Sequence, residues 1–336
     1  MSKAFRSDSP RVGDRVVARR RFGAGPQPTY SDVIGHVLSL NPLVIRPQSV
    51  GGFPSSLPAI TVADNELHVL KRLSPRTIRN SDIRAVEVAT AAAFPGASQQ
   101  WTSDGQWLMR AGEGITERSN SAAPLGPSAG FHPLPLDEIK EFYSAHDLPV
   151  RLLIPERIGR SAEKVIASPG WSLGPEILVM TRQLDPDISE PDTGGYQIQI
   201  DSRPDADWLA LYHFRGHRLP AAALRTLCKD IEGELAFGRV LGGDGATLAI
   251  TRGSLTDSGD GTRWLGFSAV EVSATHRRQG LATMLGAAML HWGARQGASA
   301  AYLQVIADND AGHRLYTHLG FGEHHRHRYA EYRAQV

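Results

Sequence analysis

Short runs of alternating apolar and polar residues dominate the first part of the chain, between Val12 and Leu73. Alternation with a period of two is typical of half-buried β-strands, and clusters of glycine and proline separate the runs. The expected strands cover residues 14–19, 31–38, 43–46, 59–62 and 68–72. Because these strands are short and no helical period intervenes, residues 1–74 are predicted to form a small β-barrel.

The pattern changes to helical spacing after Ser74. Apolar residues between Asp82 and Phe94 recur at the spacing of one helix face, and Pro95-Gly96 ends that run. The next expected elements are a strand at 106–111, a Ser/Pro/Gly-rich loop at 119–130, a helix at 136–143 and a strand at 148–154. Residues 75–190 are therefore predicted to form a second, mixed α/β segment.

A third segment, residues 191–336, combines both periodicities. Its expected helices cover residues 205–212, 221–228, 281–296 and 310–319. Its expected strands cover residues 235–241, 247–251, 264–272, 300–306 and a terminal run through 329–333. Asp-Gly turns between the middle strands favour hairpins, so the sheet is expected to be mostly antiparallel. The predicted fold class is mixed α/β.

The amino-acid composition indicates the cellular compartment and the classes of binding partner to expect. The 336 residues include 36 Lys and Arg against 35 Asp and Glu, a formal net charge of +1, so neither nucleic acid nor an anionic membrane is favoured as main partner. The single cysteine, Cys228, excludes an intrachain disulfide, and the N-terminus lacks an apolar run of signal-peptide length. No run approaches the roughly 20 apolar residues of a membrane-spanning helix. We expect a cytoplasmic protein without a membrane partner, and the sequence leaves its oligomeric state open.

A basic, glycine-bearing turn follows the strand that ends at Val272. The sequence from Arg277 to Thr283 leads directly into a helix, whose first backbone N–H groups lack intrahelical partners and carry partial positive charge. Gly280 lets the backbone approach a ligand closely, and Ala282 keeps the helix start slim. Arg277 and its neighbour add charges that pair with phosphate oxygens. The turn is predicted to bind a pyrophosphate.

A second motif lies about thirty residues downstream and narrows the class of ligand expected at the turn. It runs Asn309-x-x-Gly312-x-x-Leu315-Tyr316-x-x-Leu319-Gly320-Phe321. Together with Arg277-x-x-Gly280-x-Ala282, this motif resembles the GCN5-related N-acetyltransferase (GNAT) family over residues 262–322. The resemblance implies acetyl-CoA as co-substrate and direct transfer of the acetyl group to a primary amine.

The resemblance also assigns roles to individual residues. The residues expected to bind acetyl-CoA are Val270, Val272, Arg277, Arg278, Gln279, Gly280, Leu281, Ala282, Thr283, Asn309 and Tyr316. The turn would hold the pyrophosphate, the strand end at Val270 to Val272 would align the pantetheine arm, and Tyr316 would face the thioester sulfur. No metal site is expected, because His324, His325 and His327 have no cysteine beside them.

Acyl transfer needs an oxyanion donor, an acid and a base. The backbone N–H near Val272 is the candidate oxyanion donor, and Tyr316 is the candidate acid. Two positions at which family members carry a basic glutamate are Gln304 and Gly266 here. Glu271 is therefore the candidate catalytic carboxylate, with Glu234 and a water chain as alternatives.

The whole chain further resembles two-half actinobacterial GNAT proteins with an SH3-like front, some of which are N-acetylglutamate synthases. Residues 75–190 would then be a degenerate GNAT-like half and residues 191–336 the catalytic half. Trp107, Arg110, Arg118 and Asn120 are candidate substrate contacts at the boundary between the halves. Arg326, Arg328 and Arg333 either bind a carboxylate substrate or form a solvated basic face.

The favoured acceptor is an amino-acid α-amine such as that of glutamate, which would place the enzyme in arginine biosynthesis. Two alternatives stay open. One is an acetyltransferase that acts on protein or peptide amines, with the N-terminal barrel recruiting the target. The other is a non-catalytic, regulatory acyl-CoA-binding module.

Overall fold

The computed structural model describes the chain except for residues 1–3, 7, 24–27, 214–219, 221–223, 225–227, 229–230 and 334–336. The described residues divide into two compact units, one of residues 1–79 with 323–325 and one of residues 80–322 with 326–336. The predicted helix at 221–228 lies almost wholly outside the described residues.

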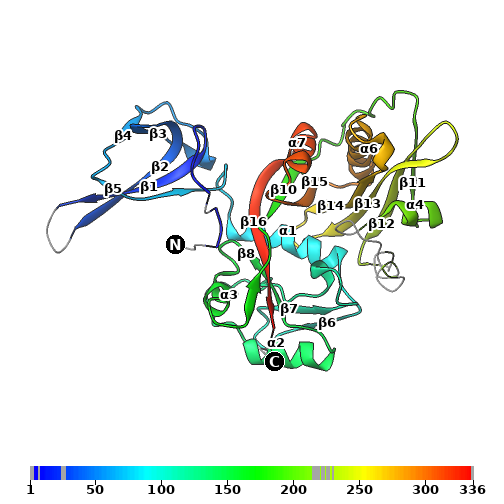
Figure 1. Cartoon of the computed structure of the whole chain (residues 1–336), viewed down its shortest axis with the longest axis horizontal. Coiled ribbons are helices and arrows are strands. Elements are labelled where there is room, and N and C mark those ends of the chain that lie inside the picture. The colour runs from blue at the N-terminus through cyan, green and yellow to red at the C-terminus, as the bar shows by residue number, and fades with distance from the viewer. Residues whose placement is uncertain are drawn as a thin grey trace. The chain divides into compact units, whose positions relative to one another are not determined.

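The first unit contains a five-stranded antiparallel sheet (Figure 1). Its strands are β1 (Arg15–Phe22), β2 (Thr29–Leu40), β3 (Leu43–Pro47), β4 (Ile60–Val62) and β5 (Leu67–Arg72), in the order β4-β3-β2-β1-β5. Alternate residues of these strands form the core, including Val16, Ala18, Val33, Val37 and Ile45. The five predicted strands are confirmed, because the period-two pattern reports directly which face is buried.

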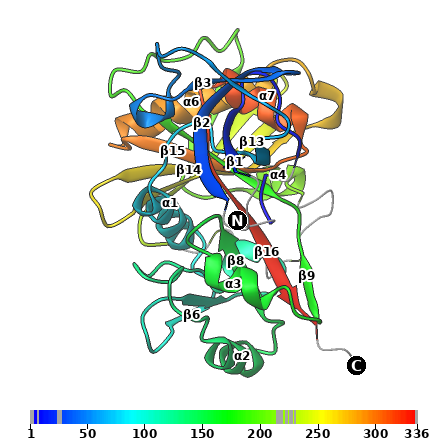
Figure 2. The ribbon, with the colours of Figure 1, turned by 90° about the vertical axis from the view of Figure 1, so that its left-hand side faces the viewer.

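One continuous sheet organises the second unit, in the order β11-β12-β13-β14-β15-β10-β16-β8. Its strands are β8 (Arg151–Pro155), β10 (Ile177–Gln183), β11 (Gln197–Asp201), β12 (Glu234–Leu241), β13 (Thr247–Asp257), β14 (Arg263–Val272), β15 (Ala300–Ile306) and β16 (Gly322–Tyr332). A further short strand, β9 (Trp171–Leu173), pairs with β16 (Figure 2). β6 (Ser98–Trp101) and β7 (Leu108–Ala111) form a separate hairpin.

The sheet joins the two predicted halves of this unit. β10 precedes the predicted boundary at residue 190, yet it lies between β15 and β16 of the later segment. β16 in turn pairs with β8 from the earlier segment. The halves therefore share backbone hydrogen bonds across one sheet. Sequence patterns did not predict β10, because its pairing partners lie more than a hundred residues away.

Six described helices accompany the sheet: α1 (Asn80–Ala93), α2 (Leu136–Ala145), α3 (Arg160–Val165), α4 (Ala206–Leu211), α6 (Leu281–Arg295) and α7 (Asp310–His318). Adjacent residues of one strand point to opposite faces of a sheet. Leu265 of β14 packs in the same core as α6, whereas Trp264 packs against α1. α1 and α6 therefore cover opposite faces.

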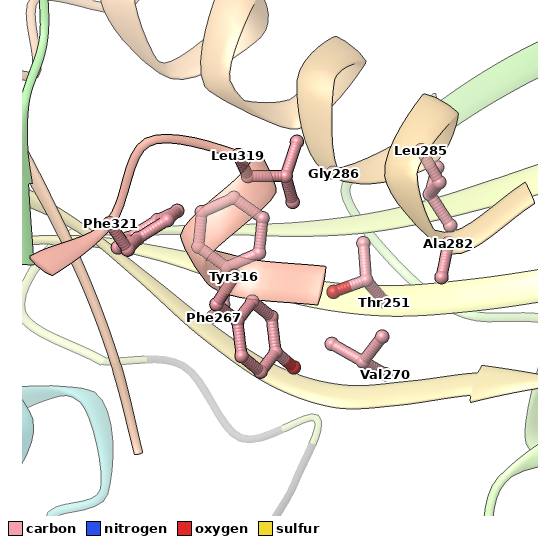
Figure 3. Close-up of a pocket in the computed structure, with 9 residues that line it drawn as sticks. All are labelled: Thr251, Phe267, Val270, Ala282, Leu285, Gly286, Tyr316, Leu319 and Phe321. Atoms are coloured by element: carbon pink, nitrogen blue, oxygen red, sulfur yellow. The ribbon is translucent and has the colours of Figure 1, made fainter. Parts of the chain in front are cut away.

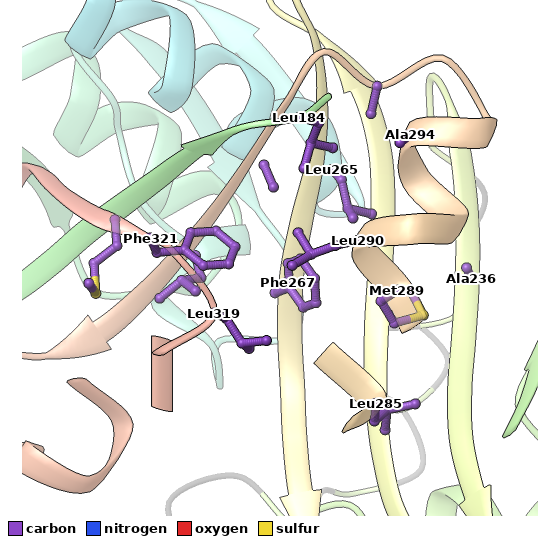
Figure 4. Close-up of a cluster of buried hydrophobic side chains, with 14 of the residues drawn as sticks. Leu184, Ala236, Leu265, Phe267, Leu285, Met289, Leu290, Ala294, Leu319 and Phe321 are labelled. Carbon is purple, nitrogen blue, oxygen red and sulfur yellow. The ribbon is translucent and has the colours of Figure 1, made fainter. Parts of the chain in front are cut away.

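The α6 face of the sheet holds the largest apolar core (Figure 4). Leu281, Leu285 and Met289 recur every four residues on the helix and are almost fully buried. Glycines in the sheet make room for them, since a Cβ at Gly253 would lie 2.6 Å from the Met289 Cε. This close packing fixes the start of α6 against β13 and β14, and with it the turn that precedes the helix. Within the described residues, no helix is long and apolar enough to cross a membrane.

Candidate active site

β14 and β15 separate partway along their length. They pair in parallel only where Trp264–Gly266 meets Ala300–Tyr302. Beyond that point β14 continues to Val272 and β15 to Ile306, and neither pairs with the other, although β15 stays paired with β10. Because a sheet normally closes this space with backbone hydrogen bonds, the separation opens a cleft between the two strand ends.

A β-bulge in β14 accompanies the separation. Its pairing with β13 shifts so that Ala269 and Val270 together oppose the single residue Thr251. Ala269 adopts φ +54°, a conformation that non-glycine residues rarely take. A bulge of two residues against one bends the strand and increases its twist, which turns the end of β14 away from β15.

The hydrogen bond of Ser273, the residue after β14, shows which way the last N–H groups of the strand point. The Ser273 N–H donates to the Leu248 carbonyl of β13 at 2.8 Å. Successive N–H groups of a strand point to opposite sides, so the Val272 N–H points away from β13 and toward the opening between β14 and β15. Among the described residues, the strand end thus directs a backbone donor into the cleft.

The cleft has a volume of about 640 Å³. Residues from four parts of the second unit line it: Arg118 from the earlier segment, Phe267 to Val272 of β14, Gln304 to Ile306 of β15, and Asn309, Leu315 and Tyr316 around α7. Arg277 and Ala282 of the basic turn border it as well. Six of the eleven residues that the sequence predicts to bind acetyl-CoA line this cleft: Val270, Val272, Arg277, Ala282, Asn309 and Tyr316. The other five, Arg278, Gln279, Gly280, Leu281 and Thr283, belong to the same turn and helix start but do not line it.

The turn between β14 and α6 exposes a run of backbone donors. Among the described residues, no N–H from Arg278 to Thr283 donates to a backbone carbonyl of another loop or turn. Arg278 and Gly280 both have positive φ, at +64° and +80°. A Cβ at Gly280 would meet no protein atom within 4 Å, so the space beside the backbone is open. These features fit a diphosphate, whose oxygens accept several N–H groups at once.

Tyr316 lines the cleft from α7. Its ring packs edge-on to Phe321 at 6.2 Å, and its hydroxyl points toward Val270 in Figure 3. Within the described residues this hydroxyl makes no hydrogen bond, and burial raises the pKa of Tyr316 to about 12. The phenol therefore keeps its proton at neutral pH and presents it to the cleft.

Asn309 has a structural role that the sequence motif did not reveal. Its Oδ1 accepts the Gly312 N–H at 3.0 Å and caps α7. Gly312 fits tightly beneath it, because a Cβ there would lie 2.9 Å from Val305. Asn309 therefore fixes the start of the helix that carries Tyr316, and it also lines the cleft.

The carboxylates differ in position. Glu271 lines the cleft, and burial raises the pKa of its carboxyl, an effect that His213 and Arg277 oppose. Glu234 instead forms an exposed 2.7 Å ion pair with Arg263, at the opposite end of β14. Gly266 has no room for a glutamate, since a Cβ there would lie 2.5 Å from the Tyr302 hydroxyl. Gln304 lines the cleft but cannot accept a proton at neutral pH.

The predicted boundary contacts divide into one cleft residue and three structural ones. Arg118 lines the cleft, whereas Trp107, Arg110 and Asn120 are buried. The Arg110 guanidinium donates to Phe94 and Ser121, and the Asn120 Oδ1 accepts two backbone N–H groups of the adjacent loop. The sequence did not distinguish the cleft residue from the structural residues, because all four lie close together between residues 107 and 120.

The basic and histidine-rich end of the chain has partners of its own. Arg326 and Arg328 both pair with Glu176, and Arg333 pairs with Glu331. The Nδ1 of His327 lies 2.7 Å from the Glu87 carboxylate, with both side chains fully buried. None of these residues lines the cleft described above. The expectation that the arginines form a solvated face is wrong for Arg326, which is buried.

Comparison with known proteins agrees with this geometry. A family model described as "Probable histone acetyltransferase Rv0428c C-terminal" matches residues 80–330. A second model, described as the Rv0428c N-terminal Sm-like domain, matches residues 10–51. The N-terminal sheet is therefore placed with Sm-like domains, a more specific description than the SH3-like resemblance of its sequence.

Two relatives extend over most of the chain. The probable histone acetyltransferase Rv0428c of Mycobacterium tuberculosis is 36% identical over 321 residues and covers 95% of both chains. The uncharacterized N-acetyltransferase YobR of Bacillus subtilis is 26% identical over 264 residues, which cover 73% of this chain and 97% of YobR.

Solved structures show the same fold. A GCN5-related N-acetyltransferase from Kribbella flavida aligns with a TM-score of 0.54 at 16% identity, over 75% of this chain and 96% of its own. A tandem GNAT protein from the clavulanic acid biosynthesis pathway aligns with a TM-score of 0.52 at 15% identity, over 75% and 89%. With the family model, the relatives and the splayed sheet in agreement, the chain belongs to the GCN5-related N-acetyltransferase family and is an N-acetyltransferase.

Proposed function

We propose that this enzyme binds acetyl-CoA in the cleft between β14 and β15 and transfers its acetyl group to the α-amine of a small amino acid, with glutamate as first candidate. The observation that carries the proposal is the run of N–H groups from Arg278 to Thr283, which donate to no backbone carbonyl among the described residues and follow Arg277 at the border of that cleft. Such a run matches the diphosphate of a coenzyme A ester. Arg277 and Arg278 supply additional positive charge.

The proposed reaction is a direct attack. A neutral amine nitrogen bonds to the thioester carbonyl carbon, and the carbon–sulfur bond breaks as the tetrahedral intermediate collapses. The Val272 N–H, directed into the opening, stabilises the negative charge that develops on the carbonyl oxygen. Tyr316 donates its proton to the leaving thiolate, and its raised pKa ensures that the proton is present.

Glu271 is the proposed proton acceptor for the attacking amine. It lines the cleft from β14 and interacts electrostatically with Tyr212 and His213, which follow α4. Burial raises the pKa of the Glu271 carboxyl, which makes the carboxylate a stronger base than an exposed glutamate. A water between Glu271 and the amine would serve the same transfer.

A second acceptor class is favoured by one observation. The relative at 36% identity is named a probable histone acetyltransferase, which would imply a protein amine as acceptor. In that case the N-terminal Sm-like unit would recruit the protein target. The acceptor screen below separates the two classes.

The Gly280→Leu variant tests acetyl-CoA binding. Leucine is strained at φ +80° and fills the space beside the backbone donors, so we expect at least about a tenfold loss of affinity in calorimetry. Gly259→Leu is the matched control, because Gly259 has φ +77° and open space but lies in the hairpin before β14. Wild-type protein that shows no acetyl-CoA binding would refute the proposed function.

The Tyr316→Phe variant tests the acid. Loss of the hydroxyl should lower kcat by about 10²-fold or more, since a positioned acid contributes that much, and should leave the acetyl-CoA dissociation constant unchanged. Tyr196→Phe, which alters a tyrosine in the same core, serves as control. An unaltered kcat would remove Tyr316 from proton transfer.

The Glu271→Gln variant tests the base through pH. The base form of Glu271 exists above its raised pKa, so wild-type kcat/KM should fall as pH drops through that pKa. Glutamine should reduce the rate and abolish this acidic limb. Glu234→Gln, in β12 and paired with Arg263 at the far end of β14, should keep the limb. Persistence of the limb in Glu271→Gln would assign it to another group.

An amine screen tests the acceptor. Free thiol release from acetyl-CoA should rise with L-glutamate or another free amino acid, and mass spectrometry should find the N-acetyl product. Lysine-containing peptides, including histone tails, are the competing panel. Turnover confined to the peptides would reverse the proposed order of acceptors.

A further inference from the structure

Arg118 is the cationic residue that lines the cleft from the earlier segment of the second unit. It lies in the short 3₁₀ helix Glu117–Ser119, and its side chain is half-buried. Its guanidinium stacks on the Phe94 ring at 4.3 Å. Within the described residues, no carboxylate forms an ion pair with Arg118.

A second guanidinium lies against the same ring. Arg252 of β13 stacks on Phe94 at 4.7 Å and donates to the Ala93 carbonyl at 3.0 Å. Arg252 is almost completely buried, and burial together with the charge of Arg118 lowers its pKa to about 10. Two like charges in contact with one ring raise the positive potential where Arg118 meets the cleft.

The two sides of the cleft have different chemistry. The basic turn, α6 and Tyr316 belong to one face of the sheet, where the diphosphate donors lie. Phe94 follows α1, which covers the opposite face, so Arg118 approaches from the side away from the pyrophosphate turn. The phosphates of the coenzyme therefore do not account for Arg118.

Three charged residues on the side of the cleft away from the pyrophosphate turn influence the same tyrosine. Arg118, Arg252 and Glu271 all act electrostatically on the Tyr212 hydroxyl, the arginines in one direction and the carboxylate in the other. Glu271 and Arg118 also line the same cleft. The Glu271 carboxylate can accept a proton from an amine, and the Arg118 guanidinium can bind a carboxylate. Together they match a molecule that carries an amine and a carboxylate close together.

We infer that Arg118 determines acceptor specificity: its guanidinium binds a carboxylate of the acceptor and thereby selects small amino acids over amines without a nearby negative charge. This inference rests on the proposed acetyl transfer and names its substrate class. Arg118 is preorganised for this role, because its stacking on Phe94 fixes the plane of the guanidinium fork before the acceptor arrives. It touches the acceptor and takes no part in proton transfer.

The test uses the full chain and paired acceptors that differ only in the carboxylate. The pairs are glycine with glycinamide and L-alanine with L-alaninamide. Arg118→Met keeps an unbranched, apolar side chain beside Phe94 and removes the charge, and it should raise KM for the acids by about 10- to 100-fold. KM for the amides and the acetyl-CoA dissociation constant should stay within about twofold of wild type. Arg118→Lys should recover part of the affinity, since the charge returns without the planar fork.

Arg295→Gln is the matched control, because Arg295 is an exposed arginine at the end of α6. Equal losses with acids and amides in Arg118→Met would show a packing role and overturn the inference. Unchanged KM for the acids would overturn it as well.

A binding measurement separates this inference from the proposed function. Calorimetry of L-glutamate and glycine, with and without CoA, requires no turnover. Wild-type protein should bind the acids and Arg118→Met should not. Acetyl-CoA binding without binding of any acid would sink the inference while leaving the cofactor site intact. Absence of acetyl-CoA binding would instead refute the proposed function. In that case, the binding of acids measured without CoA, in wild type and in Arg118→Met, would still test whether Arg118 binds a carboxylate.

Discussion

The structure of the second unit depends on a pair of hydrogen-bond ladders that differ in length. β15 stays paired with β10 over its full length, whereas it pairs with β14 over only three residues on its other side. The bulge at Ala269 and Val270 turns β14 outward, and the α6 core holds the strand and the following turn in that position. Every proposed catalytic contact lies at this opening: the Val272 N–H on one wall, Tyr316 beside it, and the turn from Arg278 to Thr283 at its mouth.

Among the described residues, the opening leaves backbone donors without backbone acceptors, which is normally unfavourable. The exposed turn and the cleft give these groups access to solvent. In the proposed function, a phosphate or an oxyanion would replace water at donors whose positions are already fixed, so little further ordering would be needed on binding. The same core that stabilises the unit also fixes these donors. The glycines at 238 and 253, which admit Met289, show how directly the sheet sequence serves that core.

The sequence predicted the parts of this site that depend on local chemistry. A strand followed by a basic glycine turn and a helix is a local pattern, so β14, the turn and α6 were predicted within a few residues. The five strands of the first unit were predicted for the same reason, because period-two alternation records which face is buried. Contacts made across long distances in the sequence were not predictable. Nothing local to Ile177–Gln183 indicates that β10 joins β15 to β16, and nothing local to Ala269 indicates a bulge. Likewise, Arg118 and Asn120 are two residues apart, yet one lines the cleft and the other holds a loop.

The crystal structure of the full chain with CoA bound is the most direct test of the central claim. The account predicts that the diphosphate oxygens accept N–H groups between Arg278 and Thr283, and that the sulfur lies in the opening between β14 and β15 beside the Tyr316 hydroxyl. CoA bound elsewhere, or a β14 and β15 joined by continuous hydrogen bonds beyond Gly266, would contradict it.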